Sequence, residues 1–207
     1  MTGKDEREER RRYVRKRQRT VFTVLGVVML VMVLISSVFL FHIGGAGLQS
    51  VPEATPNYGQ AAPCAPTDKA NPEAKYLSSA KVTIRVLNGT PSSGFAQAVG
   101  DALANRGFAV NSIGNYSATN VDRTIIYFGK NAISDAYTVN SNFTDAMMVM
   151  DDRTDKLVDI VLGSTFKNLR SKGKVPAAGS AIDKIKGCKD ASAMTSLPKA
   201  IEHPAVK

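Results

Sequence analysis

An uninterrupted apolar stretch near the amino end sets the first limit on how this 207-residue chain can fold. Residues 21–41 carry no charged side chain and are mostly Val, Leu, Met, Ile and Phe. With a rise of about 1.5 Å per residue, a helix of this length crosses the roughly 30 Å hydrocarbon core of a bilayer. The apolar region of a secretory signal peptide is shorter, usually about 7–15 residues, although the small residues that follow, Gly44 to Gly47, leave cleavage open. We predict a single transmembrane helix over residues 20–43.

Basic residues are distributed unevenly around this stretch. Seven cations precede it closely: Arg10, Arg11, Arg12, Arg15, Lys16, Arg17 and Arg19. Residues 43–68, in contrast, contain no Lys or Arg. Because an excess of Lys and Arg marks the cytoplasmic side of a span, we expect residues 1–19 to form an Arg-rich cytoplasmic tail and everything after about residue 43 to lie outside the cytoplasm. Binding of these arginines to nucleic acid or anionic lipid is the competing interpretation.

Residues 44–80 are expected to form a Pro-rich extracytoplasmic linker. Five of the nine prolines fall in it: Pro52, Pro56, Pro63, Pro66 and Pro72. Proline lacks an amide hydrogen, so this density opposes helix and weakens any sheet. A flexible coil of this length spans roughly 35 Å, which would let the next domain stand away from the bilayer.

Residues 81–166 have the periodicity of one small domain. Apolar and polar residues alternate after Lys81, as in a strand with one buried face, and helical spacing follows over residues 95–103. Further strands are expected at residues 108–110, 124–128, 147–150 and 158–162, with a second helix at 132–140.

The resulting order, β-α-β-β-α-β-β, predicts the α+β class: a single small sandwich domain behind one N-terminal transmembrane helix. Residues 124–128 are all β-branched or aromatic, so we expect a central strand buried on both faces. The polar run at residues 151–155 is expected to form a hairpin between the last two strands.

The net charge of +9 comes from the two ends of the chain. Residues 1–19 contain nine basic and four acidic side chains, and residues 167–207 contain nine basic and three acidic ones. The domain between them is almost neutral, so it lacks the basic surface that nucleic-acid binding requires, and we expect no nucleic-acid partner. The basic C-terminal extension, residues 167–207, is interpreted either as a contact for anionic envelope polymers or lipid headgroups, or as a solvated polar face.

The chain has two cysteines, Cys64 and Cys188, and both fall in the part expected outside the membrane. An even count in an oxidising compartment favours a disulfide over two free thiols. On the chain-entropy view, a bridge that closes such a long loop stabilises by about 4–5 kcal/mol. Two cysteines and two histidines are too few for a four-cysteine or His-rich metal site, and we expect no metal and no cofactor.

A Gly-rich turn stands between the first strand and the first helix: Asn88, Gly89, Thr90, Pro91, Ser92, Ser93 and Gly94. Amide groups at a helix start attract anions, so the turn is a candidate anion or ligand loop. Gly89 and Gly94 have Walker A spacing, but Phe95 and Ala96 stand where that motif needs Lys and Ser or Thr, which excludes nucleotide hydrolysis. A tight turn in which Ser or Thr caps the helix is the favoured alternative.

The remaining candidates do not assemble a catalytic site. Four carboxylates, Asp151, Asp152, Asp155 and Asp159, do not match the spacing of a Ca²⁺ loop and are interpreted as a polar hairpin. His42 stands at the membrane boundary and His203 in an irregular tail, so no Ser-His-Asp or Cys-His arrangement is expected in the domain.

Two patterns resemble the C-terminal domain of LytR/CpsA/Psr-type proteins. Residues 86–96 read V-x-N-G-[ST]-x-x-x-G-x-A, and residues 158–166 read V-D-x-x-L-G-x-x-F. The resemblance covers residues 81–166 and implies an envelope protein outside the cytoplasmic membrane. In larger relatives this domain follows a catalytic domain that transfers glycopolymer from a polyprenyl phosphate to peptidoglycan, and this chain has no room for one. Pro91 replaces a frequent Gly of the family's turn, and the resemblance carries no catalytic residue over.

We therefore expect a non-enzymatic, single-pass protein of the cytoplasmic membrane, with its C-terminal domain outside the cytoplasm. The expected partner is peptidoglycan, an anionic envelope polymer or an envelope protein, and the expected role is support of envelope integrity. The alternative is an accessory factor in glycopolymer transfer that binds a phosphate group at the 89–94 loop. A third hypothesis is a cytoplasm-facing regulator that acts through the Arg-rich tail.

Overall fold

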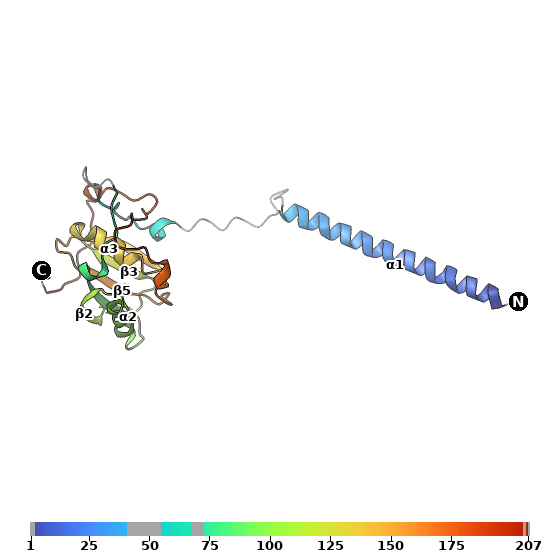
Figure 1. The fold of residues 1–207 in the computed structure, drawn as a ribbon, viewed down its shortest axis with the longest axis horizontal. Helices are drawn as coiled ribbons and strands as arrows, with labels where there is room; N and C mark the ends of the chain where they lie inside the picture. Colours follow the sequence, from blue (N-terminus) through green and yellow to red (C-terminus); the bar gives the residue numbers. More distant parts are fainter. Residues whose placement is uncertain (1–2, 41–54, 68–72, 205, 207) are drawn as a thin grey trace. The chain divides into compact units, whose positions relative to one another are not determined.

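The computed structural model describes residues 3–40, 55–67, 73–204 and 206. The chain divides into two compact units, Met1–Glu53 and Ala54–Lys207. The first contains one helix, α1 (Gly3–Leu40), drawn in blue in Figure 1. Within α1, the stretch Arg10–Val38 is long and apolar enough to cross a membrane by length and composition. The expected end of the span at residues 41–43 lies outside the described residues.

The apolar side chains of α1 are exposed, with Phe22 at 69% and Leu30 at 61%. A continuous apolar surface of this kind is unstable in water, which fits a helix solvated by lipid. The Arg-rich segment belongs to the same helix, because α1 begins at Gly3 rather than at the start of the apolar stretch.

The second unit is built on a five-stranded mixed sheet. In chain order its strands are β1 (Thr83–Asn88), β2 (Ala109–Asn115), β3 (Thr124–Phe128), β4 (Ala146–Met150) and β5 (Val158–Leu162). In space the order is β2-β1-β5-β3-β4. β1 is parallel to β2 and β5, β3 is parallel to β4, and β3 and β5 are antiparallel.

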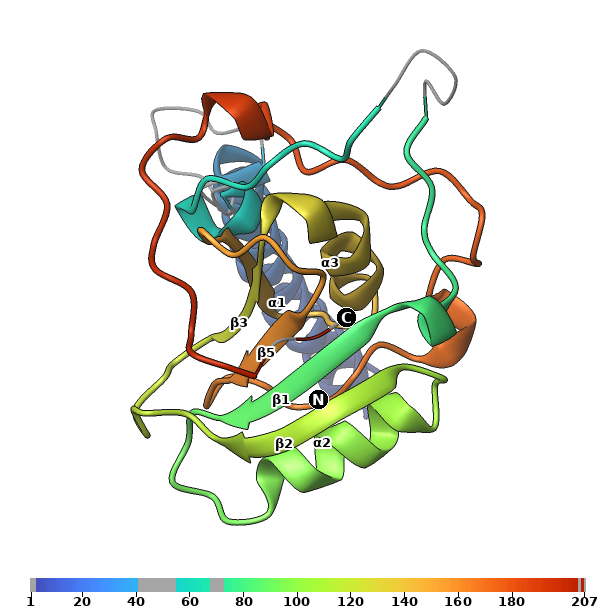
Figure 2. The ribbon, with the colours of Figure 1, turned by 90° about the vertical axis from the view of Figure 1, so that its left-hand side faces the viewer.

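Two helices join the parallel pairs. Helix α2 (Phe95–Ala104) connects β1 to β2, and a short 3₁₀ turn leads into α3 (Ile133–Asn140), which connects β3 to β4. The helix is the usual crossover between parallel neighbours, because a tight turn cannot return the chain in the same direction. The expected order β-α-β-β-α-β-β and the α+β class are confirmed, and Figure 2 shows α2 along β1 and β2, and α3 near β3 and β5.

Both helices pack on the same face of the sheet. The strand register aligns Val86, Ile160 and Ile126 on one face. All three belong to a single hydrophobic cluster that also contains Val99 of α2 and Ala136 of α3. The opposite face therefore carries the alternate residues of each strand.

Two packing expectations are wrong. The predicted hairpin between the last two strands does not form, because β3 lies between β4 and β5. The strand buried on both faces is β5 rather than β3, in which Ile125 and Tyr127 are only half-buried. Distance from the sheet edge does not explain this, because β1 holds the equivalent position and is buried after Thr83. The C-terminal segment covers the second face at β1, where Arg85 donates to the carbonyl of Glu202.

The compact unit is larger than the domain indicated by periodicity, because it begins at Ala54 and runs to Lys207. Ala62, Ala65, Tyr76 and Ile182 belong to the core, although they lie in the expected linker or in the basic extension. The linker side chains that pack are mostly small alanines, which fit against a helix without periodicity in sequence.

Backbone pairing between the two flanking segments completes this packing. Isolated β-bridges join Pro63 to Lys189 and Lys75 to Ala181. The Tyr137 hydroxyl of α3 donates a 2.9 Å hydrogen bond to the carbonyl of Pro63. Pro63 and Leu77 are therefore held against α3, whereas Asn57 bonds the backbone of Met148 in β4.

Candidate functional site

The turn between β1 and α2 is held together by its own polar groups. The Asn88 side-chain oxygen accepts hydrogen bonds from the Thr90 amide at 3.0 Å and from the Thr90 hydroxyl at 2.9 Å. The Asn88 amide group donates to the Ser92 carbonyl at 2.7 Å. Asn88 and Thr90 are both only 6% exposed. These groups are already used in forming the turn.

Gly89 and Gly94 serve the turn in different ways. A Cβ on Gly89 would lie 2.7 Å from the Leu162 carbonyl oxygen, so the glycine permits close approach of β5. Gly94 has φ of 73°, a left-handed conformation that favours glycine. Gly94 is the N-cap of α2, with no side-chain cap bond, so the expectation that Ser or Thr caps this helix is wrong. Ser92 and Ser93 are exposed, and their role as ligand groups stays a prediction.

Two of the four carboxylates expected in a polar hairpin, Asp151 and Asp159, instead belong to a buried ion network. Asp151 is 1% exposed and Asp159 is fully buried. Arg153 donates to Asp151 at 2.7 Å and to Asp159 at 2.9 Å, and Arg85 of β1 makes two 2.7 Å bonds to Asp159. The two arginines and two aspartates balance in charge, as a buried network requires. The sequence does not reveal this network, because Arg85 is 74 residues away from Asp159 and Arg153 lies in the same polar loop as Asp151.

Burial lowers the pKa of Arg153, but the Asp151 hydrogen bonds and the nearby carboxylate charges outweigh burial, so the pKa lies above its ordinary value. In the described part of the chain, no group of three His, Cys, Asp or Glu side chains could hold a metal ion. This network is therefore suited to holding the fold rather than to acid-base chemistry.

The C-terminal segment covers this network on the sheet face opposite the helices. Arg85 donates to the carbonyl of Glu202 at 2.9 Å. Asp152 accepts from the amide of Ala200 at 2.7 Å. His203, expected in an irregular tail, lies with Nε2 3.4 Å from an oxygen of Asp155. Residues 200–203 are thus part of the folded unit.

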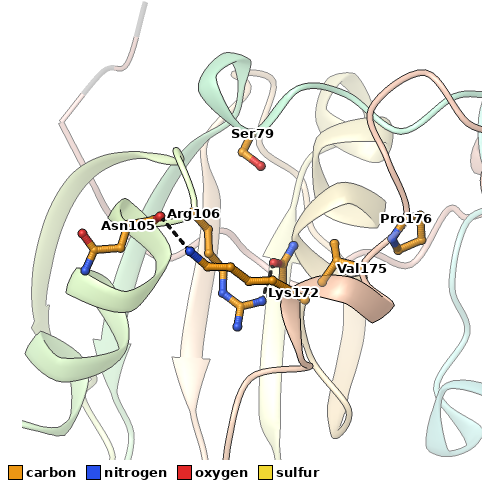
Figure 3. Close-up of a pocket in the computed structure, with 7 residues that line it drawn as sticks. Ser79, Asn105, Arg106, Lys172, Val175 and Pro176 are labelled. Carbon is orange, nitrogen blue, oxygen red and sulfur yellow. Dashed lines mark hydrogen bonds between the residues drawn. The ribbon is translucent and has the colours of Figure 1, made fainter.

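A polar pocket of about 300 Å³ lies at the carboxyl ends of both helices. Figure 3 shows its lining, which comes from the end of α2, the turn after α3, the segment before β1 and the basic extension. The lining residues are Ser79, Asn105, Arg106, Asn142, Lys172, Val175 and Pro176. Two of them are cations, and none is a carboxylate.

Each cation of the pocket is positioned by a single oxygen. Arg106 donates from Nη1 to the Asn142 side-chain oxygen at 3.0 Å. Asn142 is itself 3% exposed and donates to the Thr138 carbonyl at 3.1 Å. Lys172 reaches across the pocket to the Asn105 carbonyl at 3.4 Å, as the dashed line in Figure 3 indicates. Burial lowers the pKa of Arg106 from its ordinary value, although an arginine remains charged at neutral pH.

Residues 170–176 of the basic extension, called the strap below, lie against the end of α3 and reach the pocket. Arg170 donates from Nε to the Ser141 carbonyl and from Nη2 to the Phe143 carbonyl, both at 2.9 Å. Its own amide donates to the Asn142 carbonyl at 2.8 Å. Cations at helix carboxyl ends satisfy carbonyls that have no helical partner. This part of the extension is therefore not the solvated face that was one of its two interpretations.

Cys64 and Cys188 are joined by a disulfide, with their Cα atoms 4.9 Å apart. The bridge adjoins the backbone pairing of Pro63 with Lys189. It ties the segment before the domain to the segment after it, across α3. A pocket beside it is lined by Ile133, Asp190 and Ala191, together with residues 64–67.

Comparison with known proteins identifies the class of domain. Residues 81–166 match the model of the LytR_C family, which is described as LytR cell envelope-related transcriptional attenuator. The match includes the whole five-stranded sheet and both crossover helices. It excludes the strap and both cysteines.

One solved structure is similar to this chain. It is the soluble domain of a conserved hypothetical secreted protein from Mycobacterium marinum, with 26% sequence identity and a TM-score of 0.47. The similarity covers 53% of this chain and 82% of that one. None of the curated proteins matches this chain.

Sequence analysis did not single out the pocket. Arg106 closely follows α2 and Asn142 closely follows α3 in the sequence. Only the tertiary structure brings both residues together with Lys172. The available signal was the position of Arg106 just after a predicted helix, which is a common place for a cation and indicates no ligand by itself.

Proposed function

We propose that this protein is a non-enzymatic, membrane-anchored component of the cell envelope that binds a cell-wall component or another envelope protein and supports envelope integrity. The observation that carries the proposal is a LytR_C domain in the same chain as one N-terminal apolar helix. The helix anchors the domain, so the domain acts within reach of the membrane.

The charge around α1 supports an extracytoplasmic position for the folded unit. The Arg-rich segment precedes the span and favours the cytoplasm. The disulfide supports the same orientation, because structural disulfides persist in oxidising compartments and are rare in the cytosol.

The arrangement of polar groups supports binding rather than catalysis. The buried carboxylates Asp151 and Asp159 are neutralised by arginines and are not poised as general acid or base. The pocket offers hydrogen-bond donors from Arg106 and Lys172, a combination that holds an anionic group.

An Arg-rich start, one span and a Pro-rich segment before the domain are also similar to the actinobacterial cell-envelope integrity protein. This resemblance is the source of the proposed role in integrity. The specific partner of this protein is to be identified by the retention and crosslinking experiment that follows.

The test is retention of the full chain, in a neutral detergent and with its disulfide intact, on purified peptidoglycan sacculi. We expect sedimentation with sacculi, and in membranes we expect crosslinks to envelope components. A variant that lacks residues 54–207 is the control for adhesion of the anchor. The proposal fails if the full chain is folded, yet is neither retained nor crosslinked above that control.

The alternative role in glycopolymer transfer makes a separate prediction. It requires binding of a polyprenyl phosphate at the 89–94 loop, and the internal hydrogen bonds of Asn88 and Thr90 do not favour it. Loss of polyprenyl phosphate binding in Ser92→Ala or Ser93→Ala, at unchanged melting temperature, would move it to first place.

A further inference from the structure

We infer that the pocket lined by Arg106 and Lys172 binds an anionic sugar unit of an envelope polymer, charged by a phosphodiester or a carboxylate. The inference rests on the proposed function in one respect: the polymer is encountered outside the membrane. The site itself is argued from charge balance, positioning and the shape of the space next to the cations.

Charge balance distinguishes the cations of this pocket from the two arginines of the buried ion network. Arg85 and Arg153 are each paired with a carboxylate at 2.7 Å. Arg106 and Lys172 contact only an amide oxygen and a backbone carbonyl among the described residues. A guanidinium has five N–H donors and an ammonium has three, so most of their hydrogen-bonding capacity is available to a ligand.

The helix ends oppose this positive charge only in part. A helix carboxyl terminus carries roughly half of a negative elementary charge, and two such ends lie at the pocket. Two full cations exceed them, so the pocket stays positive. Each side chain uses only one donor within the protein: Arg106 bonds the Asn142 side-chain oxygen, and Lys172 bonds the Asn105 carbonyl at the end of α2.

The cations are held where a ligand would meet them. Arg106 is half-buried and its guanidinium is held by Asn142, whose own side chain is fixed by the Thr138 carbonyl of α3. Positioning before binding reduces the side-chain entropy lost on association. The planar guanidinium also matches the two oxygens of a phosphate or carboxylate.

The space next to the cations is suited to a sugar ring. A second pocket, of about 260 Å³, shares Arg106, Asn142 and Pro176 with the first. It adds the exposed Ser78, together with small apolar surfaces and with Thr138 and Ser141, whose hydroxyls already donate to backbone carbonyls. Hydroxyl and amide groups beside an apolar surface match sugar hydroxyls and ring carbons, while the cations match an attached charge.

The experiment measures binding of three soluble polymers to the full chain in a neutral detergent at fixed salt. Poly(glycerol phosphate) presents phosphodiesters, polygalacturonate presents sugar carboxylates, and dextran is the neutral reference. We expect binding to at least one anionic polymer and none to dextran. The stronger of the two anionic polymers identifies the charged group.

Variants then locate the site. We expect Arg106→Gln and Lys172→Gln each to weaken binding about tenfold, because each removes a charged hydrogen-bond donor. Lys184→Gln is the matched control, because Lys184 is exposed, lies in the same basic extension and loses the same charge. Arg106→Lys keeps the charge but loses the planar fork, so it should restore only part of the affinity.

The outcomes are separable from those of the proposed function. Equal weakening in all three Gln variants would mean diffuse charge attraction and would overturn the site, as would unchanged affinity in Lys172→Gln. Melting temperatures decide whether Arg106→Gln is folded, and Lys172→Gln, at an exposed position, carries the test if it is not. If sacculi retain wild type and Arg106→Gln equally, the envelope role stands and this site falls.

Discussion

Arg85 of β1 and Asp159 of β5 form a two-pronged ion pair, with Nε to Oδ1 and Nη2 to Oδ2 both at 2.7 Å. The strands are parallel neighbours and these two residues are register partners, so the pair lies on the sheet face opposite α2 and α3. Asp159 also accepts from Arg153, and Arg85 reaches the carbonyl of Glu202. One buried carboxylate thus links two strands, a loop and the end of the chain.

Asp159→Asn is expected to destabilise the folded unit strongly. The substitution leaves the buried guanidinium groups of Arg85 and Arg153 with one carboxylate in place of two. Removal of one partner from a buried ion pair lowers the free energy of unfolding by about 3–5 kcal/mol. The measurement is the free energy of unfolding from denaturant titration. Asp101→Asn, at an exposed helical position, is the control and should change stability by less than about 0.5 kcal/mol. Equal effects from both variants would show that the network does not stabilise the fold.

Reduction of the Cys64–Cys188 disulfide is expected to lower the melting temperature. The bridge closes a loop with a sequence separation of 124 and connects both flanking segments. Loss of such a bridge costs roughly 2–5 kcal/mol. Mass spectrometry after alkylation without reductant should find no modified cysteine in the exported protein, and quantitative labelling of both thiols would refute the pairing. The Cys64→Ser and Cys188→Ser double variant is the control, because its melting should not respond to reductant.

Gly94→Val is expected to destabilise the unit through backbone strain alone. Its φ of 73° is unfavourable for a side chain, whereas an added Cβ would meet no atom within 4 Å. The cost is about 1–2 kcal/mol or more, since valine is β-branched. Ser92→Ala and Ser93→Ala should each cost less than about 0.5 kcal/mol, because neither serine caps α2. A larger cost at either serine would reinstate a serine cap.

Alkaline conditions are expected to destabilise the unit through Tyr127. Burial, with a further contribution from Tyr116, raises the pKa of Tyr127 from 10.0 to about 12. Because the folded-state pKa lies above the unfolded one, its contribution to stability is complete below about pH 10 and is lost as the pH rises toward about 12. Denaturant titrations at intervals from pH 9 to about 12 should show a shallower decline in Tyr127→Phe than in wild type. An identical decline would assign the loss to other groups.

Alkaline phosphatase fused after Lys207 is expected to be active in cells. The excess of Lys and Arg precedes the span, so the carboxyl end should lie outside the cytoplasm, where this enzyme folds. A fusion placed after Arg19 is the control and should be inactive. The opposite pattern, confirmed with a cytoplasmic reporter, would contradict the orientation.

Local pattern was sufficient for several features of this protein. A charge-free stretch longer than a bilayer is thick predicts a spanning helix without knowledge of any partner. The alternation after Lys81 and the helical spacing after Phe95 predict strand and helix in the observed order, because both depend on neighbours in sequence. The LytR_C resemblance at residues 81–166 was readable for the same reason, since its two patterns are contiguous.

Other features were decided only by tertiary structure. Nothing local indicates that β3 inserts between β4 and β5, because strand order depends on how two crossovers close over one core. The Ala- and Pro-rich segment before Lys81 packs through small side chains and backbone pairing, which leave no periodic signal. Arg106, Asn142 and Lys172 meet because two helices end at the same place and a strap crosses them. Charges far apart in sequence become a site only when the fold brings them within hydrogen-bond distance.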